Sequence, residues 1–259
     1  MTGGVLDRIV ARTRLDVAAR TERIPRAALE ARLEGTPRDF RGALAAPGLG
    51  LIAEFKPSSP SRGALRPDAV PEEFAAAYRP YAAAISVLCD EPFFGGSREA
   101  LGRIRAASGL PVLCKDFLVT PYQLVEARAA GADAVLLMVV LLDDGELGEL
   151  LGLARELEMA ALVEVHDGTE RTRALDAGAD IVGVNSRDLR TLEVDLARIE
   201  ELADGLPESV IRVGESGLHD RDDVARVAPL VDAVLIGTAL MISPDPAARI
   251  EALGFAPCR

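Results

Sequence analysis

The feature that most constrains the fold is an alternation of short apolar runs with amphipathic helical patterns, which continues from residue 49 to the end of the chain. The runs are rich in Val, Ile and Leu, which is typical of strands buried on both faces of a parallel sheet. Two Ala-Gly-Ala-Asp segments, 130–133 and 177–180, place a glycine where one helix ends and the next strand begins. The predicted strands are residues 49–55, 83–88, 111–114, 133–138, 160–165, 180–184, 209–214 and 232–236. The predicted helices are residues 71–78, 98–107, 121–130, 145–158, 170–177, 194–202, 221–227 and 246–253.

Eight strands alternating with eight helices predict an α/β protein with a closed (β/α)8 barrel, a fold that typically occupies about 250 residues. A doubly wound open sheet is the alternative. The absence of a G-x-G-x-x-G sequence after the first strand favours the barrel. No linker or low-complexity segment interrupts the alternation, so residues 1–259 are expected to form one domain.

Residues 1–45 precede the barrel and are expected to form a helical extension that packs on it. The spacing of apolar residues predicts one amphipathic helix with a face made of Val5, Ile9, Leu15, Val17 and Ala18. A second helix is predicted at residues 26–33, after Pro25, and the Gly-Thr-Pro sequence at 35–37 ends it.

Composition excludes several classes of protein. The net charge is -12, from 41 acidic and 29 basic residues, which disfavours nucleic-acid binding because phosphate contacts need a basic face. A small anionic substrate remains compatible, since it responds to local charge. The three cysteines show no metal or disulfide spacing, which predicts reduced thiols and a cytoplasmic protein. No signal peptide, membrane span or metal motif is expected from the sequence.

Lysine is confined to two positions, Lys56 and Lys115, although the chain has 29 basic residues. Arginine keeps its proton in proteins, whereas burial and neighbouring charges can tune an ammonium group. Both lysines stand where an apolar run gives way to a loop, and Glu54 shares a strand face with Lys56. The two lysines are therefore the leading catalytic candidates, and a simple surface ion pair is the plainer alternative for Glu54 and Lys56.

Other polar residues collect at the carboxyl ends of the predicted strands, where barrel enzymes place their active sites. Such groups are costly to bury unless they are paired. Strand alternation puts Glu164 on the same face as Leu162, and Glu215 on the same face as Val213, so both carboxylates are expected to face inward. His166 shares this parity but lies past the strand end, where a capping or supporting role is as consistent as catalysis.

Two small-residue turns, 214–217 and 237–239, follow the last two predicted strands. Glycines expose backbone N–H groups, and barrels often bind phosphate at these two loops. Ser59 and Ser61 of the first loop offer further hydroxyl donors. The pair of turns predicts a phosphate site.

Seven segments occur in the order and register typical of the indole-3-glycerol phosphate synthase family: IAEFKPSSPS, ISVLCDEPFFGGS, PVLCKDF, LVEVH, GVNSRDL, GESG and LIGTALM. The resemblance covers essentially the whole chain, including the helical extension. It implies a lyase of tryptophan biosynthesis that closes the ring of 1-(2-carboxyphenylamino)-1-deoxyribulose 5-phosphate and releases carbon dioxide and water. It also implies no cofactor, no metal, a monomer, and no nucleic-acid or membrane partner.

The resemblance implies roles for individual residues. Lys115 looks like the general acid and Glu164 like its acid/base partner, while Lys56 looks like the group that holds the substrate carboxylate. Glu54 and Asn185 look like orienting residues, and Glu215 is expected at the rim, where it would bind a hydroxyl. The expected phosphate residues are Ser59, Ser216, Gly217, Gly237 and Thr238. The expected apolar wall is Phe94, Phe117, Leu136 and Leu189, and further expected substrate contacts are Ser61, Ser86, Arg187 and Leu235.

One departure from the family pattern is Pro57-Ser58, which stands where many relatives carry basic residues. Arg62 is the candidate to supply that charge from further along the loop. Three alternatives remain open from the residues: a Schiff-base aldolase, the phosphoribosylanthranilate isomerase that acts one step earlier, and a non-catalytic phosphosugar-binding module. Retention of both lysines in a chain that otherwise avoids lysine argues against the last.

Overall fold

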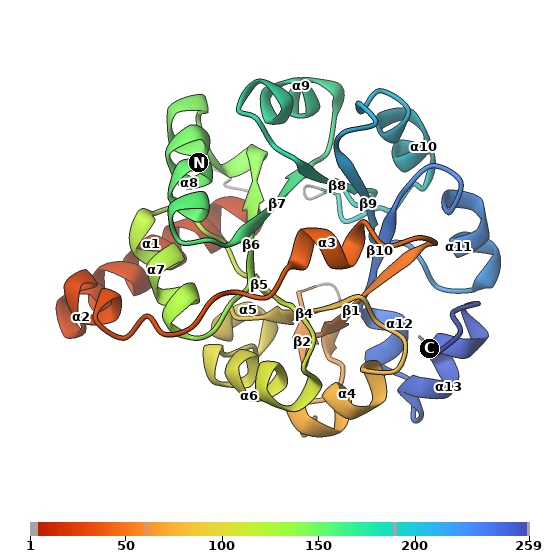
Figure 1. Ribbon diagram of the computed structural model, residues 1–259, viewed down its shortest axis with the longest axis horizontal. Coiled ribbons are helices and arrows are strands. Elements are labelled where there is room, and N and C mark those ends of the chain that lie inside the picture. The colour runs from red at the N-terminus through yellow and green to blue at the C-terminus, as the bar shows by residue number, and fades with distance from the viewer. Residues whose placement is uncertain (1–4, 61, 189–190, 258–259) are drawn as a thin grey trace.

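The computed structural model describes residues 5–60, 62–188 and 191–257, and its helices surround a central set of strands (Figure 1). Within these residues, eight parallel strands close into a barrel in the order β1-β10-β9-β8-β7-β6-β5-β4. Their bounds are β1 Gly50–Phe55, β4 Ala84–Leu88, β5 Val112–Lys115, β6 Ala134–Met138, β7 Ala160–Val165, β8 Ile181–Asn185, β9 Ile211–Glu215 and β10 Ala233–Ile236. The prediction of a closed barrel is confirmed.

The predicted barrel helices lie close to their expected positions. They are α4 Pro71–Tyr78, α6 Arg98–Ser108, α7 Pro121–Ala129, α8 Asp144–Glu156, α9 Gly168–Asp176, α10 Ala197–Ala203, α11 Arg221–Val227 and α13 Pro246–Ala252. Three short helices were not predicted: α5 Glu91–Phe94, η1 Val139–Leu141 and α12 Thr238–Met241. Asp or Ser side chains accept hydrogen bonds from first-turn backbone N–H groups at several of their starts, for example Ser97 at α6 and Asp143 at α8. A short antiparallel hairpin, β2 Ser58–Ser59 with β3 Gly63–Ala64, occupies the first loop.

The apolar residues of each strand alternate between two environments. One group fills the barrel interior and includes Ile52, Leu162 and Val213, while a larger group packs between strands and outer helices and includes Leu51 and Val163. The predicted inward parity of Leu162 and Val213 is confirmed, and it carries the polar residues two positions further along into the mouth of the barrel.

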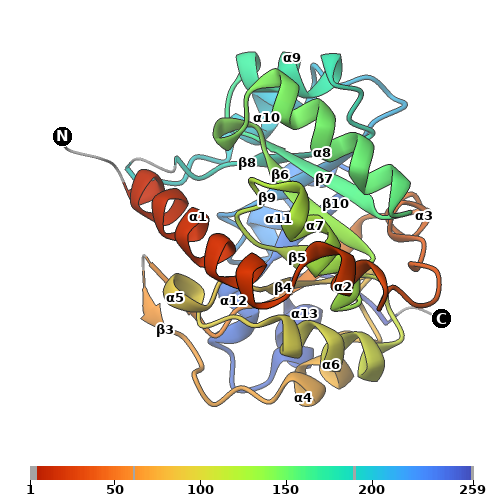
Figure 2. The same ribbon diagram turned by 90° about the vertical axis from the view of Figure 1, so that its left-hand side faces the viewer.

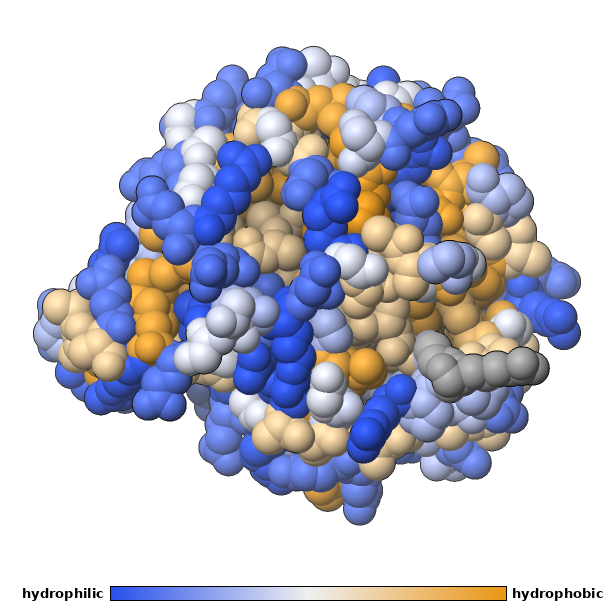
Figure 3. Space-filling view, viewed as in Figure 1, coloured by the Kyte–Doolittle hydropathy of each residue, from blue (hydrophilic) through white to orange (hydrophobic). Residues whose placement is uncertain are grey.

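A short helix that the sequence analysis missed, α3 Phe40–Leu44, crosses the barrel at the amino-terminal ends of the strands (Figure 1). Phe40 and Leu44 are both 1% exposed and pack with the interior residues Ile52 and Ile211. In the space-filling view of the same face, side chains cover the centre of the barrel (Figure 3). The extension therefore plugs this end of the barrel.

The other helices of the extension are α1 Val5–Arg23 and α2 Arg26–Glu30. The two ends of the extension lie at opposite ends of the barrel. The start of α1 lies on the same side of the molecule as β3, and α3 lies on the opposite side (Figure 2). Val17 packs with Leu29 of α2 and with Tyr122 of α7. The Tyr122 hydroxyl also donates to the backbone oxygen of Ile24 at 3.0 Å, which ties the extension to α7.

The predicted apolar face of α1 is wrong in part. Leu15 is 70% exposed and Ala18 is exposed, whereas Ile9, Thr13 and Val17 are buried at a spacing of four residues. The buried stripe therefore includes a threonine that apolar periodicity could not identify. The side chain of Val5 lies outside the described part of the structure. Among the described helices, none is long and apolar enough to cross a membrane.

Candidate active site

A cavity of about 180 Å³ opens at the carboxyl ends of the barrel strands. Most of the predicted site residues line it: Glu54, Lys56, Ser59, Phe94, Lys115, Phe117, Leu136, Glu164, Asn185, Arg187, Ser216, Gly217, Leu235, Gly237 and Thr238. They come from all eight strands or the segments that follow them, which explains how residues far apart in sequence converge.

Two predicted residues, Ser86 and Glu215, are not part of this lining. Ser86 is fully buried in β4, and its hydroxyl is not among the cavity-lining groups. Glu215 is also fully buried, so its expected position at the rim is wrong. Ser61 and Leu189 lie outside the described residues.

Part of the cavity wall escaped sequence reasoning. Leu6 and Ile9 of α1 line the mouth, together with Met138 of β6 and Leu218 after β9. Leu6 and Ile9 lie three residues apart, a spacing that places both on one helix face. The spacing in the sequence could therefore have shown that Leu6 and Ile9 share a helix face. It could not have shown that this face meets the catalytic end of the barrel.

A cluster of two ammonium groups and two carboxylates lies at the cavity, in which Lys56, Lys115 and Glu54 line the wall and Glu215 is buried next to Lys115. Lys56 Nζ lies 2.8 Å from Glu54 Oε1, and Lys115 Nζ lies 3.4 Å from Glu54 Oε2. Lys115 Nζ also donates to Glu215 Oε2 at 2.9 Å. The structure thus brings the two lysines together, bridged by Glu54, with Glu215 in direct contact with Lys115.

The charges of this cluster move its pKa values in different directions. Burial alone would raise the pKa of Glu54, but Lys56 and Lys115 outweigh burial and lower the pKa to about 2. Burial would lower the pKa of Lys115, yet Glu215, Glu54 and Glu164 raise it above its ordinary value. Burial raises the pKa of Glu215 to about 7, with a contribution from the charge of Glu164 that opposes Lys115. Lys115 is therefore a charged acid, and Glu215 is the carboxylate that binds a proton near neutral pH.

Glu164 occupies a different environment from the one expected for a direct partner of Lys115. It is 2% exposed, and its Oε1 lies 3.3 Å from His166 Nε2. Burial would raise the pKa of Glu164, but His166, Lys115 and Asn185 lower it. Lys115 therefore acts on Glu164 through its charge, while the carboxylates that contact Lys115 are Glu215 and Glu54.

Two glycines leave room for the buried carboxylates. A Cβ atom at Gly183 of β8 would overlap Glu215 Oε1. A Cβ atom at Gly237 would overlap Glu54 Oε1 and would lie 2.9 Å from its Cδ and 3.1 Å from its Cβ. The carboxylates of Glu215 and Glu54 occupy the space that a side chain at these positions would fill. Both positions therefore need glycine because the carboxylates pack against the backbone, and not because the backbone adopts an unusual conformation.

Substitution of Gly237 by Ala is expected to lower both turnover and stability. The added methyl group would push Glu54 away from Lys56 and Lys115, and overpacking of this kind costs about 1–3 kcal/mol of unfolding free energy. Steady-state kinetics and a thermal melt would measure the two effects. Gly148→Ala in α8 is the matched control, because nothing lies within 4 Å of its added Cβ. Equal behaviour of the two variants would contradict the close-approach argument.

The residues expected to bind phosphate that the structure describes all line the cavity. Ser216 and Gly217 adopt left-handed backbone with φ of 67° and 76°, and a Cβ at Gly217 would lie 2.5 Å from Val194 Cγ1. A left-handed conformation is uncommon for serine and is found most often at functional turns. Burial, then the nearby charge of Arg62, lowers the pKa of Arg187. The charge of Arg187 at the cavity, with that of Arg62 nearby, is suited to binding an anion.

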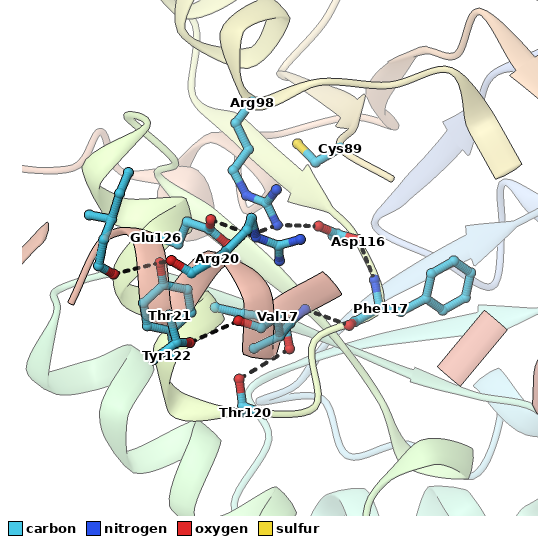
Figure 4. A network of polar contacts seen from close by, with 12 residues as sticks. Val17, Arg20, Thr21, Cys89, Arg98, Asp116, Phe117, Thr120, Tyr122 and Glu126 are labelled. Atoms are coloured by element: carbon cyan, nitrogen blue, oxygen red, sulfur yellow. Dashed lines mark hydrogen bonds and ion pairs between the residues drawn. The ribbon is translucent and has the colours of Figure 1, made fainter. Parts of the chain in front are cut away.

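A polar network outside the cavity supports the turn that follows Lys115 (Figure 4). Arg98 Nη2 of α6 lies 2.7 Å from Asp116 Oδ2 and 3.1 Å from Glu126 Oε2 of α7. Arg20 Nε of α1 donates to Glu126 Oε1 at 2.8 Å, and Asp116 Oδ1 accepts the Phe117 backbone N–H at 2.9 Å. The network therefore links the N-terminal extension to the residue next to Lys115.

The described part of the chain contains no group of three or more His, Cys, Asp or Glu side chains placed to hold a metal ion. Lys56 and Lys115 are paired with Glu54 and Glu215, whereas Ser59 Oγ and Glu164 Oε1 have no hydrogen-bond partner among the described residues. This arrangement can donate protons, accept protons and bind carboxylate or phosphate groups.

Comparison with known proteins adds to the geometry. A family model described as "Indole-3-glycerol phosphate synthase" matches residues 6–253. A relative of that name from Mycolicibacterium smegmatis is 47% identical over 253 residues, which are 96% of this chain and 93% of the relative. Another of the same name from Albidiferax ferrireducens is 45% identical over 257 residues, which are 96% of this chain and 97% of the relative.

Solved structures support the fold alone. Thiamine phosphate pyrophosphorylase from Pyrococcus furiosus is similar with a TM-score of 0.59 at 18% identity, over 79% of this chain and 93% of that one. A 3-hexulose-6-phosphate synthase from Salmonella typhimurium gives a TM-score of 0.63 at 16% identity, over 79% and 96% of the two chains. The family match spans nearly the whole barrel together with α1, and the chain belongs to the indole-3-glycerol phosphate synthase family.

Proposed function

We propose that the chain catalyses ring closure of 1-(2-carboxyphenylamino)-1-deoxyribulose 5-phosphate to indole-3-glycerol phosphate, carbon dioxide and water. Family membership supports this activity. The single observation that carries it is the convergence of Lys56, Lys115, Glu54 and Glu164 at one cavity, beside an apolar wall. Such a site can bind an anionic aromatic compound and move protons on it.

Lys115 is the general acid of this proposal. Ring closure transfers an electron pair from the aryl carbon to the carbonyl carbon, and the carbonyl oxygen takes a proton as the new bond forms. Lys115 is protonated at neutral pH because of Glu215 and Glu54, and its ammonium group faces the cavity. A positioned acid of this kind contributes about 10²–10⁴-fold to rate.

Lys56 is the proposed clamp for the substrate carboxylate, which leaves later as carbon dioxide. Its Nζ is held by Glu54, and its side chain is 15% exposed at the cavity wall. The rings of Phe94 and Phe117, with centroids 6.0 Å apart, form the wall proposed for the anthranilate ring. Holding the aryl carbon against the carbonyl group supplies a further rate factor through effective concentration.

Glu164 is the proposed base of the dehydration step. The hydroxyl formed by ring closure leaves as water after it takes a second proton, and one proton is removed from the substrate as the double bond forms. Because the carboxylate departs as neutral carbon dioxide, the overall reaction takes up one proton from solvent. Glu215 beside Lys115, with a pKa of about 7, is proposed to return a proton to that amine.

The phosphate group is proposed to bind at the side of the cavity that carries Ser59, Ser216, Gly217, Gly237 and Thr238. Arg187 and Arg62 would supply positive charge there, and Arg62 would thereby compensate for the absence of basic residues at 57 and 58.

The affinity for substrate should depend less on salt concentration in Arg62→Gln than in the wild-type chain, because the variant lacks one positive charge that salt would screen.

The chain is further proposed to work as a single-domain monomer in the cytoplasm. Cys89 and Cys114 are free and buried, which is compatible with a reducing compartment. The closed barrel leaves no strand edge open for pairing with a second chain, as far as the described residues show. Sedimentation or gel filtration of the purified chain would test the monomer.

Turnover of the carboxyanilino substrate, followed by indole fluorescence, tests the proposed function directly. Fluorescence that grows in proportion to enzyme would support it, whereas none across the neutral pH range would contradict it. Reduction with borohydride addresses the aldolase alternative, because a Schiff-base enzyme would leave a stable adduct on Lys115. We expect no adduct.

Replacement of Glu164 by Gln is expected to lower kcat by about 100-fold with little change in melting temperature. Glutamine has nearly the same shape but cannot accept a proton. Glu149→Gln, the same change at an exposed position of α8, is the control and is expected to keep full activity. A Glu164→Gln enzyme with normal kcat would remove Glu164 from the dehydration step.

A further inference from the structure

His166 lies directly behind Glu164 and has no part in the chemistry proposed above. It follows β7 by one residue, and its side chain is 11% exposed. Glu164 lines the cavity, whereas His166 is not among the lining residues. Any influence of His166 on the reaction must therefore pass through Glu164.

Glu170, in the first turn of α9, fixes the orientation of the imidazole ring. Its Oε2 accepts the His166 backbone N–H at 2.8 Å and lies 3.0 Å from the ring Nδ1. The Glu170 backbone N–H in turn donates to Asp167, the residue that caps α9, at 2.9 Å. With Nδ1 held on this side, Nε2 lies 3.3 Å from Glu164 Oε1, which is an ion-pair distance without a hydrogen bond between the two atoms. Helix capping explains the backbone contact but not the two ring contacts.

The ring lies between two carboxylates, Glu164 of β7 and Glu170 of α9. Burial would lower the pKa of His166, but these two charges outweigh it and raise the pKa to about 10. The imidazolium in turn helps to lower the pKa of Glu164, which is also lowered by Lys115 of β5 and Asn185 of β8. Among these groups, His166 is the cation that contacts Glu164 directly.

The substrate makes such a cation useful. It carries a carboxylate and a phosphate, and anions entering an enclosed cavity raise the pKa of a nearby carboxylate. The positive charge of Lys115 can oppose this rise in the pKa of Glu164 only in part, because Lys115 also pairs with Glu215 at 2.9 Å and Glu54 at 3.4 Å. A positive charge on the side of Glu164 remote from the substrate opposes this rise without competing for the bound anions.

We infer that His166, anchored by Glu170, is a positioning residue that stays protonated at neutral pH and holds Glu164 as a carboxylate aimed into the cavity while the anionic substrate is bound. This inference rests on the proposed role of Glu164 as a base. No atom of His166 reacts, and the only proton that moves is the one that Glu164 accepts.

The charge of His166 can be measured without turnover. The chain has two histidines, so ¹⁵N-histidine labelling gives two ring spin systems, and His219→Asn assigns them. We expect both ring nitrogens of His166 to remain protonated at pH 8, where about 97% of an unperturbed imidazole is neutral. A neutral His166 ring at that pH would overturn the inference, whether or not the proposed activity is found.

Kinetics test the effect on Glu164. His166→Gln is expected to move the acidic limb of the kcat profile up by about one pH unit, which lowers kcat by up to about tenfold on that limb and little at neutral pH, because loss of the cation raises the pKa of Glu164. KM should stay within about twofold, since His166 does not touch the substrate. Glu149→Gln, at an exposed position that does not line the cavity, is the control and should leave kcat and its pH profile unchanged.

Glu170→Gln provides a second variant that keeps the histidine. Removal of the anchoring carboxylate lowers the pKa of His166, so the imidazolium should lose its proton at a lower pH than in the wild type, and this enzyme should keep the wild-type acidic limb of kcat, where His166 is still protonated. A kcat loss that is independent of pH in both variants, and that parallels a fall in melting temperature, would indicate a purely structural role and would overturn the inference. Absence of turnover in the wild-type chain would contradict the proposed function instead, and would leave the NMR result standing.

Discussion

Replacement of Lys115 by Met is expected to lower kcat by about 10²–10⁴-fold, the usual contribution of a positioned general acid. Lys115 contacts Glu54 and Glu215, and these carboxylates keep it protonated and aimed into the cavity. Methionine has a similar length but neither charge nor proton. The loss should appear in kcat and kcat/KM together, because the missing interaction belongs to the transition state.

Binding of inorganic phosphate provides the control for this variant. Phosphate is expected at the residues after β9 and β10, which do not depend on Lys115, so its affinity should change by less than about twofold. Loss of phosphate binding together with turnover would assign Lys115 a folding role. Lys115→Arg, which keeps the positive charge but cannot release its proton, should also be nearly inactive. An active arginine variant would contradict acid catalysis by this residue.

Replacement of Arg98 by Met is expected to destabilise the fold by about 3–5 kcal/mol, the cost of removing one partner from a buried ion pair. Arg98 lies between Asp116, which is 6% exposed as a side chain, and Glu126, at 12%. Its loss leaves Asp116 without its cation and leaves Glu126 with Arg20 alone. Urea unfolding would measure the change in free energy.

Arg103→Met on the same helix is the matched control. Arg103 pairs with Glu72 at 2.7 Å, but both side chains are more than 40% exposed. An exposed pair contributes about 0–1 kcal/mol, so this variant should unfold almost as the wild type does. Equal losses in the two variants would mean that the position in α6, rather than burial of the charges, determines stability.

The sequence predicted the barrel because its strands are short, apolar and regularly spaced. The bounds of α4 and α11 match the prediction, and each strand differs by at most two residues at either end. The short helix α3 escaped prediction because five residues contain too little periodicity, although Phe40 and Leu44 share one face. The buried Thr13 of α1 was missed because the pattern was read from apolar residues alone, and threonine is polar.

The candidate site was predictable in its membership but not in its pairings. Strand parity correctly predicted that Glu164 and Glu215 face inward. Parity could not show how deeply Glu215 lies in the barrel. Strand β9 extends one residue further than expected, so Glu215 pairs in register with Asn185 and lies below the rim of the cavity. Nor could parity show that Glu164 faces His166, because the choice of neighbour depends on side-chain rotamers and the curvature of the barrel.

The position of α1 has a practical consequence for anyone who expresses this protein. Leu6 and Ile9 help to wall the catalytic mouth, while Arg20 reaches Glu126 in the network that supports the Lys115 turn. An affinity tag joined directly ahead of residue 5 would emerge beside the opening through which ligands pass. Purification handles are therefore better attached at the opposite terminus, after α13, where the chain contributes nothing described to the cavity.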